Sequence, residues 1–134
     1  MSGVALSVLP ERPASPREAL QDTLPFSPTA QRDFSKTDIV TAFFEVYQRS
    51  FSTRVPAMVR MRITDEHETV VVTTEQPIEA NAFQPRKVGS DTLLVAPVPY
   101  RLPIDRLSPG RFLVTFEVGL GSTTLRRDIQ LTVR

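Results

Sequence analysis

The strongest constraint on the fold is a strict alternation of apolar and polar side chains near the end of the chain. Every second residue is apolar, in the order Phe112, Val114, Phe116 and Val118. A period of two places these side chains on one face of a β-strand. The turn residues Ser108, Pro109 and Gly110 come just before, so residues 100–118 are predicted as strand, tight turn and strand. Prolines at 97, 99 and 103 predict that the first arm is an edge strand or an irregular one.

The same period recurs along the rest of the chain. It predicts strands at residues 39–48, 55–65, 69–75 and 123–133, whose inward sets include Val40, Ala42, Phe44, Val46, Ala57, Val59, Met61, Ile63, Leu125, Ile129, Leu131 and Val133. Residues 91–98 are apolar but hold a proline, which indicates an edge strand or a bulge. Residues 77–89 lack a period, so we expect a long connection with a short strand around residue 83. Six to eight short strands predict an all-β, antiparallel sandwich of the immunoglobulin or fibronectin-III type.

The first 36 residues differ from the rest. Of the 12 prolines in the chain, five lie here, at positions 10, 13, 16, 25 and 28. Proline suits extended linkers and turns better than helices. We therefore divide the chain into a Pro-rich N-terminal segment, residues 1–36, and a sandwich, residues 37–134. Within the segment, residues 4–9 are expected to form a short strand, and residues 15–20 at most one or two helical turns.

Composition excludes several classes of protein. The net charge is +1, with 16 basic and 15 acidic residues, whereas a non-specific nucleic-acid binder carries a clear basic excess. The chain has no cysteine, which excludes disulfides and thiol chemistry. No apolar run approaches the ~20 residues of a membrane span. The apolar stretch at residues 4–9 is too short for a signal peptide, so we expect any export to depend on a segment not present here.

A catalytic or metal-binding role is not expected. His67, the single histidine, lies between Glu66 and Glu68 in a predicted hairpin turn, and a stable zinc site needs three or four ligands. Asp65 and the two glutamates could offer oxygens to Ca²⁺, but no glycine-bearing calcium loop is present. Because the single histidine lies in a turn, we do not expect a Ser-His-Asp triad. Residues 119–122 read as a hairpin turn and not as a phosphate loop. We therefore assign no catalytic, cofactor-binding or metal-binding residues, and no cofactor.

Two sets of surface residues could serve a partner. Arg60 and Arg62 on one strand face, with Arg126 nearby, could bind an anion, but basic residues on a sheet more often pair with acidic ones across strands. Three aromatic side chains fall off the inward registers, namely Phe43, Phe51 and Phe83. They would form an exposed apolar patch or lie beneath the N-terminal segment, and we favour the second arrangement.

Parts of the chain resemble a known family. The relevant stretches are residues 24–34 (LPFSPTAQRDF), residues 38–48 (DIVTAFFEVYQ), residues 102–104 with 107–112 (LPI and LSPGRF), and residues 126–133 (RRDIQLTV). They are similar to the region that follows the von Willebrand factor A domain in bacterial VWFA-related proteins. The resemblance covers nearly the whole chain and implies an immunoglobulin-like sandwich at the C-terminus of an exported protein. The Asp-x-Ser-x-Ser metal site of the A domain is absent, so no metal role carries over.

We therefore expect a non-catalytic accessory, adhesion or protein-interaction domain of a larger exported bacterial protein, outside the cytoplasm. Its partner would be a protein or a neighbouring domain of the same polypeptide, with no nucleic acid, no membrane insertion and no small-molecule substrate. One alternative is a carbohydrate- or polymer-binding sandwich, for which the absence of Trp and the presence of only Tyr47 and Tyr100 make a poor stacking surface. Another is a strand-exchange assembly module with the N-terminal segment as the exchanged element.

Overall fold

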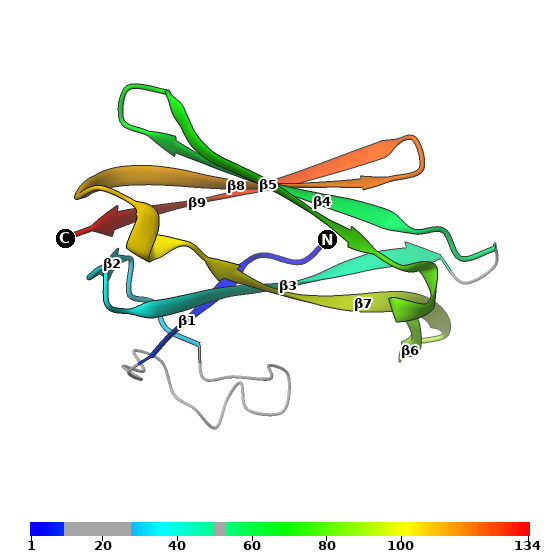
Figure 1. Ribbon diagram of the computed structural model, residues 1–134. Coiled ribbons are helices and arrows are strands. Elements are labelled where there is room, and N and C mark those ends of the chain that lie inside the picture. The colour runs from blue at the N-terminus through cyan, green and yellow to red at the C-terminus, as the bar shows by residue number, and fades with distance from the viewer. Residues whose placement is uncertain (10–27, 50–52) are drawn as a thin grey trace.

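Two β-sheets face each other across an apolar core (Figure 1). The structure, a computed structural model, describes residues 1–9, 28–49 and 53–134. Within these residues nine strands occur: β1 (Ala5–Leu9), β2 (Asp33–Phe34), β3 (Ile39–Arg49), β4 (Ala57–Asp65), β5 (Val70–Ile78), β6 (Gln84–Val88), β7 (Asp91–Leu102), β8 (Gly110–Leu120) and β9 (Thr123–Val133). Two 3₁₀ turns, η1 (Ala80–Ala82) and η2 (Ile104–Arg106), complete the set. None of the described helical turns is long and apolar enough to cross a membrane.

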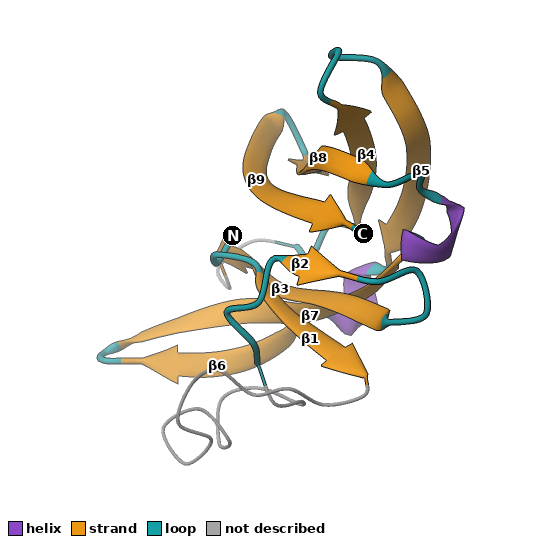
Figure 2. Cartoon of the chain, turned by 90° about the vertical axis from the view of Figure 1, so that its left-hand side faces the viewer, coloured by secondary structure: helices purple, strands orange, loops and turns teal. Residues whose placement is uncertain are grey.

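The strand order confirms the predicted sandwich. One sheet has four strands in the order β1-β3-β7-β6, and the other has five in the order β2-β9-β8-β4-β5. Every pair is antiparallel except β2 and β9, which run parallel. In immunoglobulin-type sandwiches the first, second, fifth and fourth strands form one sheet, and the third, sixth and seventh form the other. The present order matches this arrangement, with β2 and β5 added at the edges of the five-stranded sheet. Figure 2 shows the two layers from the end of the sandwich.

The inward faces carry the predicted apolar residues. On β3 and β4 the alternating sets at 40–46 and 57–63 are buried, as are Val114, Phe116 and Val118 on β8. The Phe116 ring lies at the centre, 5.1 Å from the ring of Phe44 and 5.6 Å from that of Tyr100, with tilted and edge-to-face geometry. Aromatic pairs prefer such orientations over face-to-face stacking. This cluster joins β3 and β7 of one sheet to β8 of the other.

The prediction of a hairpin over residues 100–118 was wrong. β7 belongs to the four-stranded sheet and β8 to the five-stranded sheet, so the connection crosses from one layer to the other. Ile104 on η2 and Leu107 after it are buried and fill the end of the sandwich. Gly110, at the start of β8, has φ +153°, a conformation that favours glycine. The turn residues and apolar spacing were identified correctly, but they do not reveal which sheet each strand joins.

β7 is also not an edge strand, contrary to the prediction from its prolines. It has 12 residues and lies between β3 and β6. Its pairing with β6 ends at Val95, whereas its pairing with β3 continues to Leu102. Pro97 and Pro99 lie beyond the end of β6, where one side of the strand has no ladder partner among the described residues. A proline whose missing N–H would point to that open side removes no ladder bond.

The region around residue 83 differs from the prediction as well. β5 continues to Ile78, a 3₁₀ turn takes the place of the expected short strand, and β6 follows at once. In the N-terminal part, β1 confirms the predicted strand and pairs with β3, while β2 pairs with β9. The expected helical turns at residues 15–20 lie outside the described residues. The boundary between residues 36 and 37 stays a prediction.

Candidate functional site

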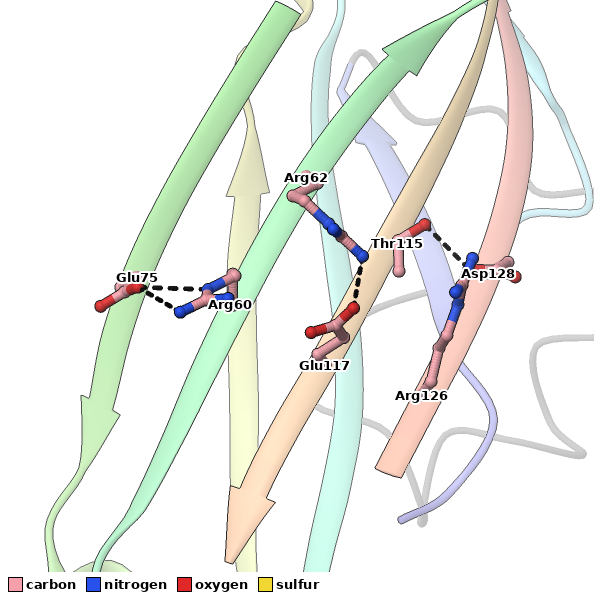
Figure 3. A network of polar contacts seen from close by, with 7 residues as sticks. All are labelled: Arg60, Arg62, Glu75, Thr115, Glu117, Arg126 and Asp128. Atoms are coloured by element: carbon pink, nitrogen blue, oxygen red, sulfur yellow. Dashed lines mark hydrogen bonds and ion pairs between the residues drawn. The ribbon is translucent and has the colours of Figure 1, made fainter. Parts of the chain in front are cut away.

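The outer face of the five-stranded sheet carries a continuous group of polar side chains, here called the charged face (Figure 3). It arises because inward positions on β4, β8 and β9 are apolar and the alternate positions point outward. Two strands of the group, β4 and β9, bear basic residues, and their neighbours bear acidic or hydroxyl side chains. Its members are Arg60 and Arg62 on β4, Glu75 on β5, Thr115 and Glu117 on β8, and Arg126 and Asp128 on β9.

Strand register places these charges in alternating order. Arg60 lies opposite Glu75 on one side and opposite Glu117 on the other, and Glu117 in turn lies opposite Arg126. The row therefore reads acidic, basic, acidic, basic across four strands. Opposite charges facing each other across strands stabilise a sheet, and like charges destabilise it. The row thus supports this register of the five-stranded sheet over its alternatives.

Each arginine of the charged face has an acidic partner. Arg60 donates through Nε and Nη2 to one Glu75 oxygen, at 3.1 and 3.0 Å, and Arg62 Nη2 donates to Glu117 Oε1. Arg126 Nε donates to Asp128 Oδ1 at 3.1 Å. The expected pairing of basic residues with acidic ones is confirmed, and the anion-binding patch that we weighed against it is not supported. Exposed ion pairs of this kind stabilise by ~0.2–1 kcal/mol each.

Asp128 accepts hydrogen bonds from two residues of the charged face. Its Oδ1 also accepts a hydrogen bond of 2.8 Å from Thr115 Oγ1. Partial burial opposes ionisation of this carboxyl, but the hydrogen bonds from Arg126 and Thr115 outweigh it and lower the pKa of Asp128. The carboxylate is therefore ionised at neutral pH and acts as an acceptor, not as an acid.

A second ion pair lies on the outer face of the other sheet. Arg86 of β6 reaches past β7 to Glu45 of β3, with hydrogen bonds of 3.0 and 2.6 Å, and the Tyr47 hydroxyl donates to the same carboxylate at 3.2 Å. The Arg86 hydrogen bonds hold the pKa of Glu45 below its usual range, although burial acts in the opposite direction. This pair links the edge strand β6 to the centre of the four-stranded sheet.

The lowered pKa predicts a pH dependence of stability. Glu45 stabilises the fold fully above the unfolded glutamate pKa of about 4.3, and this contribution is lost as pH falls through the lower folded value. We expect Arg86→Gln to lower the free energy of unfolding at pH 7, with the difference from wild type shrinking below about pH 4. Urea unfolding at pH 3 and pH 7 measures it. Arg101→Gln, which removes an exposed arginine from the same sheet, is the matched control. If Arg86→Gln lowers the free energy of unfolding equally at both pH values, Arg86 does not act through the ionised Glu45.

The polar residues of the hairpin between β4 and β5 stabilise the turn. Asp65 Oδ1 accepts backbone hydrogen bonds from His67 and Thr69, both at 2.9 Å, which serves the turn itself. Glu68 has φ +64°, so it occupies the left-handed conformation of the turn. Glu66, His67 and Glu68 are exposed. In the described part of the chain no three His, Cys, Asp or Glu residues are arranged to hold a metal ion.

Two open hollows flank this hairpin at one end of the sandwich. Their volumes are about 630 and 250 Å³, and both are lined by Asp65, Glu66, Arg111 and Phe112. Arg32 contributes to the larger hollow and Arg106 to the smaller one. Neither arginine was expected here, because the pairing beside β2 and β9 positions Arg32 and the crossing of η2 between the sheets positions Arg106. The hollows hold charges of both signs and show no nucleophile paired with a base.

The aromatic side chains offer no exposed stacking surface in the described residues. Phe43 and Phe83 are 5% and 0% exposed, so the exposed patch that we considered for them is not formed. Phe51 lies outside the described residues. Tyr100 is buried and its hydroxyl bonds to Thr74 on the facing sheet, while the Tyr47 hydroxyl is held by Glu45. Arg127 is exposed and donates to the Met1 carbonyl oxygen at 2.9 Å.

Comparisons with known proteins add little to this description. No family model and no curated protein matches the chain. Among solved structures, a family 123 glycoside hydrolase from Clostridium perfringens, described for glycolipid glycan hydrolysis, matches 99% of this chain at 9% identity and a TM-score of 0.43. The chain spans 27% of the length of that hydrolase. A likeness this weak carries no argument about activity, and the family of the chain stays a prediction from its sequence.

Proposed function

We propose that the chain is a non-catalytic accessory domain that binds a protein, or a neighbouring domain, within a larger exported bacterial protein. The observation that carries the proposal is the charged face, which is broad and continuous and bears three arginines. Arginine is enriched at protein interfaces because its planar group both stacks and donates several hydrogen bonds. The reactive groups of the described residues, by contrast, are scattered or serve turns.

The partner follows from the resemblance to VWFA-related proteins. In that family the region would follow an A domain, so an A domain is the partner to test. Interfaces between domains of one chain resemble transient protein–protein interfaces. Charges at the rim of such an interface change the rate of association more than the affinity. Paired charges suit such a surface, because each can exchange an internal partner for an external one without being left buried and unpaired.

A charge swap tests the charged face. The double variant Arg62→Glu with Glu117→Arg keeps an ion pair between these positions but sets an arginine opposite Arg60 and Arg126, so circular dichroism must verify that the variant folds. We expect the wild-type chain to bind an isolated bacterial von Willebrand factor A domain with a Kd on the order of 10–100 μM, measured by calorimetry, and the swap to weaken binding at least ~10-fold, or by about 1.4 kcal/mol. The matched control is Glu45→Arg with Arg86→Glu on the other sheet, which should bind as wild type does.

Two outcomes would contradict the proposal. Absence of binding at concentrations near 1 mM, the upper end of the micromolar-to-millimolar range, would remove the A domain as partner. Equal loss in the two swaps would remove the charged face as the interface. Hydrolysis of a chromogenic glycoside by the purified chain would contradict the non-catalytic role separately, and glycan-array binding would favour the carbohydrate alternative.

A further inference from the structure

The outer edge of β5 is long and unpaired. Among the described residues β5 forms a ladder with β4 alone, and its first five residues, 70–74, are the uncharged, β-branched run VVVTT. Val70 and Val71 are 50% and 45% exposed. Natural proteins usually protect sheet edges with short strands, charges or prolines, because unpaired N–H and C=O groups can pair with another chain.

The other open edges of the described fold are protected in these ways. Beyond its two-residue pairing with β2, the outer side of β9 carries Arg126, Arg127 and Asp128. β2 has two residues, and β1 has five and accepts a hydrogen bond of 2.8 Å at Leu6 from the N–H of Thr29. β6 carries a proline followed by Arg86 and Lys87. β5, with nine residues, has its charge and its proline only in the second half. It is therefore the edge most open to strand addition.

Pro77 indicates which backbone groups of β5 face outward. It lies opposite Met58 in a stretch of the β4–β5 ladder with unbroken register from residue 72 to residue 78. Proline cannot donate to a ladder, so it suits a position whose amide would point away from β4. Backbone direction alternates along a strand, which makes the N–H and C=O groups of Thr73 and Glu75 point to the open edge as well.

We infer that β5 pairs with β5 of a second copy of this chain, antiparallel, around a two-fold axis at Thr74. This register places Thr73 of each copy opposite Glu75 of the other, so all the outward-facing N–H and C=O groups of these residues find partners. It also sets Val70 opposite Ile78. The two five-stranded sheets then form one continuous sheet, and the interaction is closed, as two-fold pairing requires.

Charge favours the second copy as occupant and selects this register. An axis at Glu75 would set two glutamates directly opposite each other, which destabilises a sheet. An axis at Thr74 instead brings each Glu75 beside Thr73 of the other copy, whose own neighbour on β4 is Arg62. Each Glu75 thus lies in one row with the uncharged Thr73 and with Arg62 of the other copy. The β5 edge borders the charged face at Glu75, but the pairing is made by backbone groups of β5, so this inference does not depend on the proposed function.

Sedimentation of the full chain over a range of concentrations tests the pairing. Interfaces this small are weak, so we expect a monomer–dimer equilibrium with a Kd on the order of 100 μM. Thr73→Lys sets a cation on the edge, and Thr73→Pro removes an outward donor; each should weaken dimerisation at least ~10-fold, a loss of about 1.4 kcal/mol. Gln84→Lys, which adds the same charge to the edge strand β6, should not. Circular dichroism of the dilute variants verifies that they fold.

A disulfide assay tests the register. The chain has no cysteine, so single-cysteine variants have no background. An oxidised mixture of Thr73→Cys and Glu75→Cys should form disulfide dimers that join the two variants, and far fewer should form with either variant alone. A monomer at every concentration overturns the inference and leaves the edge to a strand of another protein. A dimer that Thr73→Lys does not weaken, or that Gln84→Lys weakens equally, overturns it too.

Discussion

Phe116→Ala is expected to lower the free energy of unfolding by about 3–5 kcal/mol. The side chain is fully buried and contacts Phe44 and Tyr100 on the facing sheet. Removing the ring loses its transfer free energy and leaves a cavity that the surrounding strands fill only in part. Each aromatic pair adds ~0.5–1.5 kcal/mol beyond the buried area. A domain has a total stability of about 5–15 kcal/mol, so the variant should fold only marginally.

Urea unfolding followed by circular dichroism measures this loss as a lower midpoint with an unchanged slope. Val88→Ala, on an exposed position of β6, is the control and should change stability by less than ~0.5 kcal/mol. If Phe116→Ala is too unstable to purify, Phe116→Leu can replace it. Phe116→Leu keeps the apolar character, so its free energy of unfolding should lie between those of Phe116→Ala and wild type. A loss under ~1 kcal/mol for Phe116→Ala would show that the aromatic cluster is not the centre of the core.

Ile104→Ala should cost about 2–5 kcal/mol, because η2 closes one end of the sandwich. Ile104 is 1% exposed although it lies in a three-residue turn between strands of different sheets. Its side chain extends the core beyond the strands, where the two layers would otherwise be open to water. Truncation should therefore destabilise the protein as a core substitution does, and not as a loop substitution does.

Asp105→Ala is the matched control, since Asp105 is the next residue of the same turn and is exposed. We expect it to change the free energy of unfolding by less than ~0.5 kcal/mol. Thermal unfolding of both variants gives the comparison, with a midpoint lower by at least ~5 °C for Ile104→Ala alone. Equal effects of the two substitutions would show that η2 acts through its backbone conformation and not through the buried side chain.

Most strands and their inward faces are predictable from the sequence, but the position of every strand in the sheets is not. Period-two patterns are local, so residues 40–46, 57–63 and 112–118 predicted their own burial. The proline rule failed for β7, because the open side of a central strand is created by the early end of β6, which no pattern within β7 reveals. The hairpin prediction failed at residues 103–109 since the choice of sheet depends on the partners β3 and β4, which lie far away in sequence.

The candidate site was predictable to a similar degree. Outward positions for Arg60, Arg62 and Arg126, and their pairing with acidic residues, follow from alternation and general cross-strand preference. The specific partners, such as Glu117 for Arg62, depend on the register between β4 and β8. The free edge of β5 could not be predicted at all, because an edge is defined by what does not pair beside it.

The parallel pairing of β2 with β9 has a consequence for the order in which the fold is completed. Asp33 and Phe34 pair with Thr132 and Val133, so β2 has no strand beside it until residues 132 and 133 have been synthesised. β8 likewise lacks its β9 neighbour until residues 123–133 have been synthesised. During translation β2 and β8 therefore each have an unpaired edge. Closing the loop between β2 and β9, which lie far apart in sequence, is slow. The last strand of the described fold therefore completes the sheet for one of its first strands.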